Sequence, residues 1–472
     1  MTPNLSLDLS FRLQELLKAY LLPAFQSYLP YDLIEQHRSE CSKRSRECIF
    51  TPTNTLLAML LSVTHEDKSL QQCVNMYKHV FERDCRRLEQ EEKELLDSQR
   101  NRKKETICSL GRPRKYKSKL AKTKTKEMSN NTAAYSKARK KIDLVLIEKV
   151  FAHSANFEEL DKECWHGMKT FISDGTYLQL QDTDDINTEY RVKGMDSSYP
   201  QALLQVLIRQ GSGQISQYFL GNRQESELKL VIPMINWLEE SDLLLADDLY
   251  NSYYHFSLIL SRKAHIIVPG KRERTYKVVK ELSENDQIVE IRETKCPPYL
   301  DKEEWALVPD TLLLRRINYV YPTKNGMEEC VLFTTILDEN IKAIDIILKY
   351  STRWDIEISI REIKTLIDIN VLRSKSREMM RKELAVALTA YNLVRKVIAQ
   401  SADIVGIPPQ EDIFQKCTPV SRPILMDKKG RVFYRWSTGR HGKTAQTNKP
   451  KTDTRTKRET KALPENNETW KI

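Results

Sequence analysis

The spacing of the hydrophobic positions changes along the chain. Near the start, FRLQELLKAYLL has apolar residues at helical spacing, and TPTNTLLAMLLSV begins with capping residues before a leucine-rich run. From Lys169 the period becomes two, as expected of a half-buried strand. The segment KTFISDGTYLQLQD alternates and places on one face Ile172, Asp174, Thr176, Leu178 and Leu180. QALLQVLIRQ and GQISQYFLGN flank a Gly-Ser-Gly turn, which predicts a hairpin.

Beyond the hairpin, strand and helix patterns take turns. ESELKLVIPMINWLEE predicts a helix, SDLLLAD a short buried strand, NSYYHFSLIL a helix and AHIIVPG a strand. Residues 271–325 are irregular, with short strand-like pieces such as LLLRRINYVYP, and ECVLFTTIL predicts another strand. A long apolar-faced helix, SREMMRKELAVALTAYNLVRKVIAQ, stops before GIPPQ. This order predicts an α/β core with a mixed sheet and one large insertion.

Charge points to a polyanionic partner. The 472 residues carry a net charge of +11, with a pI of about 9.0. Between Arg100 and Lys141, sixteen of 42 residues are Lys or Arg, against two acids. Within it, GRPRK at 111–115 resembles an AT-hook core, in which Arg112 and Arg114 enter a narrow minor groove. A non-specific phosphate clamp that includes Lys115 is the alternative.

Other features bound the compartment. No apolar run is long enough to span a bilayer, and the start of the chain lacks the pattern of a signal peptide. Nine cysteines are scattered without a C-x-x-C pair, which indicates reduced thiols in a reducing cytosol. We therefore expect a cytoplasmic protein without membrane contact.

The stretch YSTRWDIEISIREIK, residues 350–364, carries chemistry at helical spacing. If it forms one helix, Tyr350, Arg353, Glu357 and Lys364 fall at about 0°, 300°, 340° and 320° around the axis. A carboxylate flanked by two cations and a phenol then lies on one edge. A narrow apolar stripe runs beside it, formed by Ile356, Ile360, Ile363 and Ile367.

Two more acids precede this helix. Asp174 lies in the first central strand beside Gly175, which leaves the backbone open to close approach. Asp247 ends the buried strand LLLAD, where ligands gather in open α/β sheets. Strand alternation alone does not separate Asp247 from Asp248. Glu362 competes with Glu357 but falls on the other side of the wheel. Three such carboxylates would suit a hard divalent cation.

Together these blocks resemble a known family. The Tyr-x2-Arg-x3-Glu-x6-Lys pattern resembles the signature of cut-and-paste insertion-sequence transposases with an Asp-Asp-Glu (DDE) site. DGT around Asp174 and LLADDLYNSY around Asp247 match the same family in the same order. The resemblance runs from about residue 165 to 400 and favours Asp247 over Asp248.

The resemblance implies an RNase H-like fold with Asp174, Asp247 and Glu357 as catalytic and metal-binding acids. It implies two Mg²⁺ ions, with Mn²⁺ as a substitute, and DNA-phosphate contacts by Tyr350, Arg353 and Lys364. The expected partners are double-stranded DNA, as terminal inverted repeats and target, and a second copy of the chain in a homodimeric synaptic complex. The remaining alternatives are a catalytically inactive transposition inhibitor and a stand-alone metal-dependent nuclease.

The expected domains follow from these patterns. They are a helical N-terminal DNA-binding domain, a basic DNA-contacting linker, an RNase H-like catalytic domain, a helical C-terminal region and a basic disordered tail, at 1–95, 96–145, 146–375, 376–426 and 427–472. The resemblance also implies that the insertion, about 270–328, is strand-rich. Some relatives stack a flipped base there on an aromatic residue during hairpin formation. No Trp lies between Trp305 and Trp354, so Tyr319 and Tyr321 are the candidates here.

Overall fold

The fold is known from a computed structural model. It describes residues 25–405 except 26, 42–47, 64–67, 80–89, 91–92, 95–127, 157–163, 192–198, 224, 226, 271–273, 293–294, 324–325 and 367–368. It also describes residues 424–426 and 432–434. Arg112, Arg114 and Lys115 lie outside these residues.

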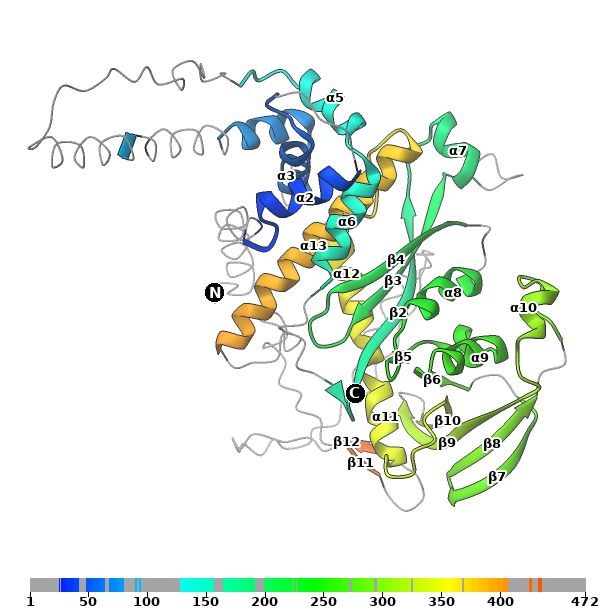
Figure 1. Ribbon diagram of the computed structural model, residues 1–472. Coiled ribbons are helices and arrows are strands. Elements are labelled where there is room, and N and C mark those ends of the chain that lie inside the picture. Colours follow the sequence, from blue (N-terminus) through cyan, green and yellow to red (C-terminus); the bar gives the residue numbers. More distant parts are fainter. Residues whose placement is uncertain are drawn as a thin grey trace, which may run out of the picture.

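A mixed sheet forms the centre of the protein (Figure 1). Its first strands are β2 (Met168–Gln179), β3 (Gln201–Arg209), β4 (Ile215–Asn222), β5 (Leu243–Leu245) and β6 (His265–Pro269). β4, β3 and β2 pair antiparallel, whereas β5 and β6 run parallel to β2. The spatial order is β4-β3-β2-β5-β6. Three antiparallel strands followed by two parallel ones make up an RNase H-like core, as predicted.

The insertion continues the same sheet. The order after β6 is β10 (Gly326–Thr334), β9 (Thr311–Thr323), β8 (Asp286–Arg292) and β7 (Tyr276–Ser283), all antiparallel neighbours. The β7–β8 hairpin is more regular than the sequence predicts. β7 is an edge strand whose residues are nearly all exposed. With no buried face, it has no hydrophobic alternation to read.

Both faces of the sheet are covered by helices. Helices α8 (Glu227–Trp237) and α9 (Tyr253–Ser261) pack on one face, which we call the α8 face. Helices α11 (Ala343–Ser351), α12 (Asp355–Leu366) and the long α13 (Arg377–Val405) pack on the other, the α12 face. Figure 1 shows α13 crossing the molecule on the side away from α8 and α9. The alternating residues of the β2 segment face the side of the sheet that the sequence predicts to be shared. Ile172, Leu178 and Leu180 all join the core of the α12 face.

The N-terminal helices form a second packing layer on α13. They are α2 (Tyr31–Cys41), α3 (Pro52–Val63), α5 (Ala133–Lys141) and α6 (Leu144–Ser154). One apolar cluster joins them to α13, whose contribution is Ala385, Val386, Ala390 and Leu393. α13 therefore links the N-terminal helices to the sheet, since its other buried residues, such as Leu384 and Leu388, belong to the core of the α12 face.

Shorter elements complete the fold. They are β1 (Cys164–Trp165), α7 (Asp184–Tyr190), the 3₁₀ turn η2 (Asp248–Tyr250), α10 (Lys302–Ala306), β11 (Ile424–Met426) and β12 (Val432–Tyr434). β12, which lies in the stretch 427–472 that the sequence predicts to be disordered, pairs with β11 just before that stretch. None of the described helices has the length and apolarity needed to cross a membrane. The described cysteines are free thiols.

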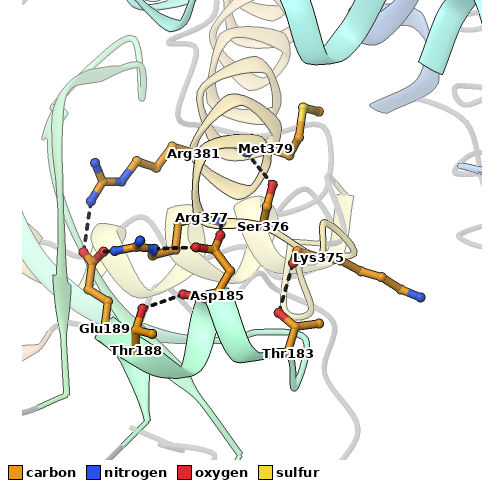
Figure 2. A network of polar contacts seen from close by, with 9 residues as sticks. All are labelled: Thr183, Asp185, Thr188, Glu189, Lys375, Ser376, Arg377, Met379 and Arg381. Atoms are coloured by element: carbon orange, nitrogen blue, oxygen red, sulfur yellow. Dashed lines mark hydrogen bonds and ion pairs between the residues drawn. The ribbon is translucent and has the colours of Figure 1, made fainter. Parts of the chain in front are cut away.

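Two ion-pair networks hold peripheral parts to this core. In the first, Arg377 and Arg381 of α13 bind Asp185 and Glu189 of α7, with nitrogen–oxygen distances of 2.9–3.3 Å (Figure 2). These side chains are 30–47% exposed. Thr183 also donates to the Lys375 carbonyl at 3.0 Å. This network fastens α7 to the start of α13.

The second network is buried. Arg315 of β9 donates from Nε to Asp286 Oδ1 of β8 at 2.8 Å and from a terminal nitrogen to Oδ2 at 2.5 Å. Its other terminal nitrogen donates to the carbonyl oxygens of Asp338 and Ile341, at 2.9 and 2.8 Å. The two side chains are 2% and 6% exposed. This pair therefore ties the insertion to the loop that leads into α11.

Candidate active site

The two aspartates stand at the same level of neighbouring strands. β2 and β5 pair in parallel through Thr170–Leu243, Phe171–Leu244 and Ile172–Leu245. Asp174 follows Ile172 by two residues, and Asp247 follows Leu245 by two. Parallel strands in register present equivalent positions on the same face, with neighbouring strands about 4.8 Å apart. The register therefore brings Asp174 and Asp247 together at the end of β5.

Local hydrogen bonds fix both carboxylates. Asp174 Oδ1 accepts from the Gly175 backbone N–H at 2.8 Å. Asp247 Oδ1 accepts from the Leu249 N–H at 2.9 Å, which makes it the N-cap of η2. Both aspartates are half-buried. A carboxylate with one oxygen engaged by a backbone N–H keeps acceptor capacity on the other oxygen.

Electrostatics separate Asp247 from its neighbour Asp248. Burial raises the pKa of Glu227, and the charges of Asp247 and Asp174 raise it further. The pKa of Tyr250 is likewise raised, by burial first, and by Glu227, Asp247 and Asp174. Asp248 contributes to neither shift. The acid that shares surroundings with Asp174 is therefore Asp247, the one that the sequence favours.

The signature segment differs from the single predicted helix. Tyr350 ends α11, Arg353 lies in the 3₁₀ turn η3 (Thr352–Trp354), and Glu357 and Lys364 lie on α12. The Ser351 and Thr352 hydroxyls donate back to the carbonyl oxygens of Leu348 and Lys349, both at 2.6 Å. Such back-bonding competes with the helical ladder and bends helices. The predicted helical-wheel positions therefore apply to Glu357 and Lys364 within α12, but not to Tyr350 and Arg353, which lie before it.

Tyr350 and Arg353 lie beside the second aspartate. The Tyr350 hydroxyl lies 3.4 Å from the carbonyl oxygen of Ala246, which directly precedes Asp247. Burial raises the pKa of Tyr350 to about 12, with smaller contributions from Asp247 and Asp248. The Arg353 guanidinium lies 5.9 Å from the centre of the Tyr350 ring and 4.7 Å from that of Trp354. Arg353 is thereby held close to the Asp247 end of the sheet.

α12 carries Glu357 over the same face of the sheet as Asp174. Ile356 and Ile363 are buried and Ile360 packs against them, so the apolar stripe is confirmed for these positions. Ile367 lies outside the described residues, as do the side chains of Glu357 and Glu362. Lys364 is half-buried in the last turn of α12.

The α11–α12 segment is tethered to the sheet at its central turn and beyond its end. At the turn, Gln210 after β3 donates to the Thr352 hydroxyl at 2.7 Å and accepts from Lys349 Nζ at 2.6 Å. Beyond its end, the backbone pairs with the last residue of β2. Gln179 N–H donates to the Asn370 carbonyl at 2.8 Å, and Leu372 N–H donates to the Gln179 carbonyl at 3.0 Å.

Several of these residues are absent from the sequence prediction. Glu227, Gln205 and Tyr250 surround the aspartates from the α8 face, and Gln210 holds the signature segment. Only the position of Tyr250, three residues after Asp247 in LLADDLYNSY, is a usable signal, because it lies in a block that carries the resemblance. Glu227, Gln205 and Gln210 lie on or next to strands and helices that meet the aspartates only through long-range pairing, which no local sequence pattern records.

The aromatic candidates of the insertion are largely committed to packing. Trp305 packs against the core of the α8 face, 6.4 Å from the Tyr253 ring centre. Tyr319 packs against the core of the α12 face, and burial is the main cause of its raised pKa. Tyr321 is half-buried. Trp354, beside Arg353, is 50% exposed. It is the most accessible of the described aromatic residues near Arg353.

The donor set suits a hard cation. Carboxylate oxygens are the ligands that Mg²⁺ and Mn²⁺ take, and Asp174 and Asp247 offer them side by side. Among the described side chains, no group of three or more His, Cys, Asp or Glu residues is arranged to hold a metal ion. The third carboxylate of the predicted set, Glu357, is not among those side chains.

Comparisons with known proteins identify transposases as similar to this chain. Residues 165–393 match the family model "Transposase DDE domain". The chain is 24% identical over 312 residues to transposase InsG for insertion sequence element IS4 of Escherichia coli (strain K12), covering 63% of this chain and 68% of that protein. The cryo-EM structure of a piggyBac transposase synaptic complex with hairpin DNA aligns with a TM-score of 0.39 at 9% identity, covering 84% of this chain and 78% of that one. Residues 165–393, which include both aspartates and the signature segment, are therefore similar to the transposase DDE domain, and the comparisons support a DNA transposase of an insertion sequence.

Proposed function

We propose that Asp174, Asp247 and Glu357 form the metal-binding catalytic site of this transposase. The observation that carries the proposal is the β2–β5 register, which sets two carboxylates side by side beneath the helix of the third. We propose Mg²⁺ as the natural ion, two per site, with Mn²⁺ as a substitute. A divalent cation supplies Lewis-acid stabilisation for the charge that develops during phosphodiester cleavage.

The protein's own groups position the DNA. Arg353 is suited to the scissile-strand phosphates, because its planar fork matches phosphate oxygens and its contacts with the Tyr350 and Trp354 rings restrict its position. Lys364 supplies a second positive charge farther along α12. Tyr350 fixes Arg353 against the Asp247 loop. Water attacks a phosphodiester at the transposon end and frees a 3′-hydroxyl, which then attacks a phosphodiester of the target in line.

The proposed partners are the terminal inverted repeats of the element, the target DNA and a second copy of the chain. The net charge of +11 supports DNA binding, because neutralising phosphates releases counterions. The N-terminal helices and the basic stretch with Arg112, Arg114 and Lys115 are the proposed contacts with the ends. Two copies would hold two ends together in a synaptic complex.

Substitution of Glu357 tests the proposal. Glu357→Gln should abolish end cleavage in Mg²⁺ while the variant still shifts end DNA in a gel, because the amide removes a charge and keeps the shape. Glu362→Gln is the matched control on the same helix and should cleave normally. Retained cleavage by Glu357→Gln would contradict the assignment.

A second assay separates transposition from simple cleavage. Wild-type protein given a pre-cleaved end with a free 3′-hydroxyl should join it to a target plasmid. Cutting without joining would identify a stand-alone nuclease, and binding without cutting a transposition inhibitor.

A further inference from the structure

A chain of buried polar side chains lies behind the two aspartates, on the α8 face. Gln205 of β3 donates to the Ser173 hydroxyl at 3.0 Å and to the Tyr250 hydroxyl. The Tyr250 hydroxyl in turn lies 3.4 Å from Glu227 Oε1, at the start of α8. Ser173, Gln205 and Tyr250 are at most 1% exposed. Ser173 directly precedes Asp174, and Tyr250 lies in the turn that Asp247 caps, so the chain links both aspartate-bearing segments to Glu227.

Gly175 makes room for this arrangement. A Cβ atom added at Gly175 would lie 2.9 Å from Glu227 Oε1 and 2.7 Å from Gln205 Oε1. Both distances are shorter than real Cβ contacts, so any side chain here would displace the two oxygens. Gly175 therefore allows Gln205 Oε1 and Glu227 Oε1 to approach β2 closely.

One of those oxygens has no partner. Gln205 is fully buried, and its Oε1 accepts no hydrogen bond from any described group. A buried carbonyl oxygen without a donor is costly. Gln205 Oε1 and Glu227 Oε1 both approach the Cβ position of Gly175, the residue next to Asp174. Two acceptor oxygens near one position favour a proton, a water molecule or a cation close to them.

The charged side chains that act on Glu227 are all negative. Asp174, Asp247 and Glu227 interact electrostatically, although Glu227 comes from the opposite face of the sheet. They meet where β5 has ended at Leu245 while β2 continues to Gln179. Among the described groups that shift the pKa of Glu227, none is a cation. The charges that act on Glu227 are therefore those of the two aspartates.

We propose that Glu227 is a fourth acid of the active site, a positioning residue that raises the affinity of Asp174 and Asp247 for a divalent cation. It acts through its charge and through the Tyr250–Gln205–Ser173 chain, without being a ligand itself. Groups around metal ligands commonly orient them in this way. The inference rests on the proposed function, because it requires the two aspartates to bind the metal.

A simpler role for Glu227 makes a different prediction. An acid in the first turn of a helix stabilises the helix dipole. If that were its whole role, its neutral variant would lower the melting temperature and leave metal affinity unchanged.

Titration of the full-length chain with Mn²⁺ alone, followed by electron paramagnetic resonance, distinguishes the two roles. We expect Glu227→Gln to weaken Mn²⁺ binding by about 10- to 100-fold, the range for groups that support metal ligands. Glu240→Gln, an exposed acid beyond the other end of α8, is the control and should bind as wild type. Wild-type affinity in Glu227→Gln would overturn the inference.

Two further variants keep the test decisive. Asp174→Asn should lose Mn²⁺ binding; if it does and Glu227→Gln does not, only this inference fails. If Asp174→Asn binds normally, the proposed function itself fails. If Glu227→Gln does not fold, Tyr250→Phe removes the linking hydroxyl while keeping the ring, and should weaken binding several-fold. Unchanged affinity in that variant would also overturn the inference.

Discussion

The proposed active site has a strand-borne half and a helix-borne half, held by different forces. Asp174 and Asp247 are fixed by backbone pairing between β2 and β5, with helices covering both faces of the sheet. The α11–α12 segment, with Arg353 and Glu357, is held by its apolar stripe and by hydrogen bonds at its central turn and beyond its end.

This difference predicts two kinds of variant. Changes in the strand-borne half remove a ligand and leave the scaffold intact, because the sheet does not depend on the carboxylates. Changes in the tethers of the helix-borne half keep every ligand but let it move. Rates are sensitive to such displacement, since misplacing a reacting group by about 1 Å costs about a hundredfold.

The largest expected effect is on the strand-borne half. Asp174→Asn should lower the rate of end cleavage by about a thousandfold, corresponding to about 4 kcal/mol of lost stabilisation. Its melting temperature should not fall, because one of three neighbouring negative charges has been removed. Single-turnover cleavage and thermal unfolding measure both. A variant that is inactive because it unfolds would contradict the separation of ligand from scaffold.

The next largest effect concerns the buried Arg315–Asp286 pair, which holds the loop before α11. Arg315→Met should lower the free energy of unfolding by about 3–5 kcal/mol, because Asp286 is left charged and buried without its partner. Denaturant unfolding measures it. The double variant Arg315→Met/Asp286→Leu should recover most of the loss. Equal instability of single and double variants would show that the ion pair does not hold the insertion to the loop before α11.

A smaller effect follows from loosening one tether. Gln210→Ala removes the hydrogen bonds to Thr352 and Lys349 and should slow cleavage about tenfold, less than a full 1 Å displacement would. Mn²⁺ affinity should stay near that of wild type. Gln287→Ala, a half-buried glutamine on β8, is the control. A normal cleavage rate in Gln210→Ala would mean that the apolar stripe alone positions the segment.

The smallest effect belongs to the exposed network of Figure 2. The backbone N–H and the guanidinium of Arg377 lower the pKa of Asp185 from its ordinary value of 3.8. Its contribution to stability is therefore complete above that value and is lost as the pH falls through the lowered pKa. The difference in melting temperature between wild type and Asp185→Asn should be small at pH 7 and should vanish once the pH lies below the lowered pKa of Asp185. A difference that grows on acidification would contradict this.

The sequence predicts the strand-borne half well. Alternation in KTFISDGTYLQLQD and the apolar run LLLAD identify β2 and β5, because both strands are buried and their patterns record it. That the two strands are neighbours, at one register, is a long-range fact that no local pattern contains. It came instead from the order of motifs shared with a family.

The sequence predicts the helix-borne half less completely. The isoleucine stripe gives the buried face of α12, but Ser351 and Thr352 break the helix by bonds that a wheel does not represent. The sequence does not predict the positions of Glu227 and Gln205, for a similar reason. Gln205 is brought near Asp174 by the pairing of β3 with β2, and Glu227 by the packing of α8 on the sheet. Asp184 and Asp185 begin the short helix α7, which contacts with α13 stabilise.

The central claim is that β2, the Asp247 turn and α12 meet at one metal-binding site. Oxidative cleavage of the polypeptide by bound Fe²⁺, with ascorbate and peroxide, tests it most directly, because iron cuts the backbone nearest its site. We predict fragments that end near residues 174, 247 and 357, suppressed by excess Mg²⁺ and absent in Asp174→Asn. Cuts at only one of these segments, or cuts that persist in Asp174→Asn, would contradict the account.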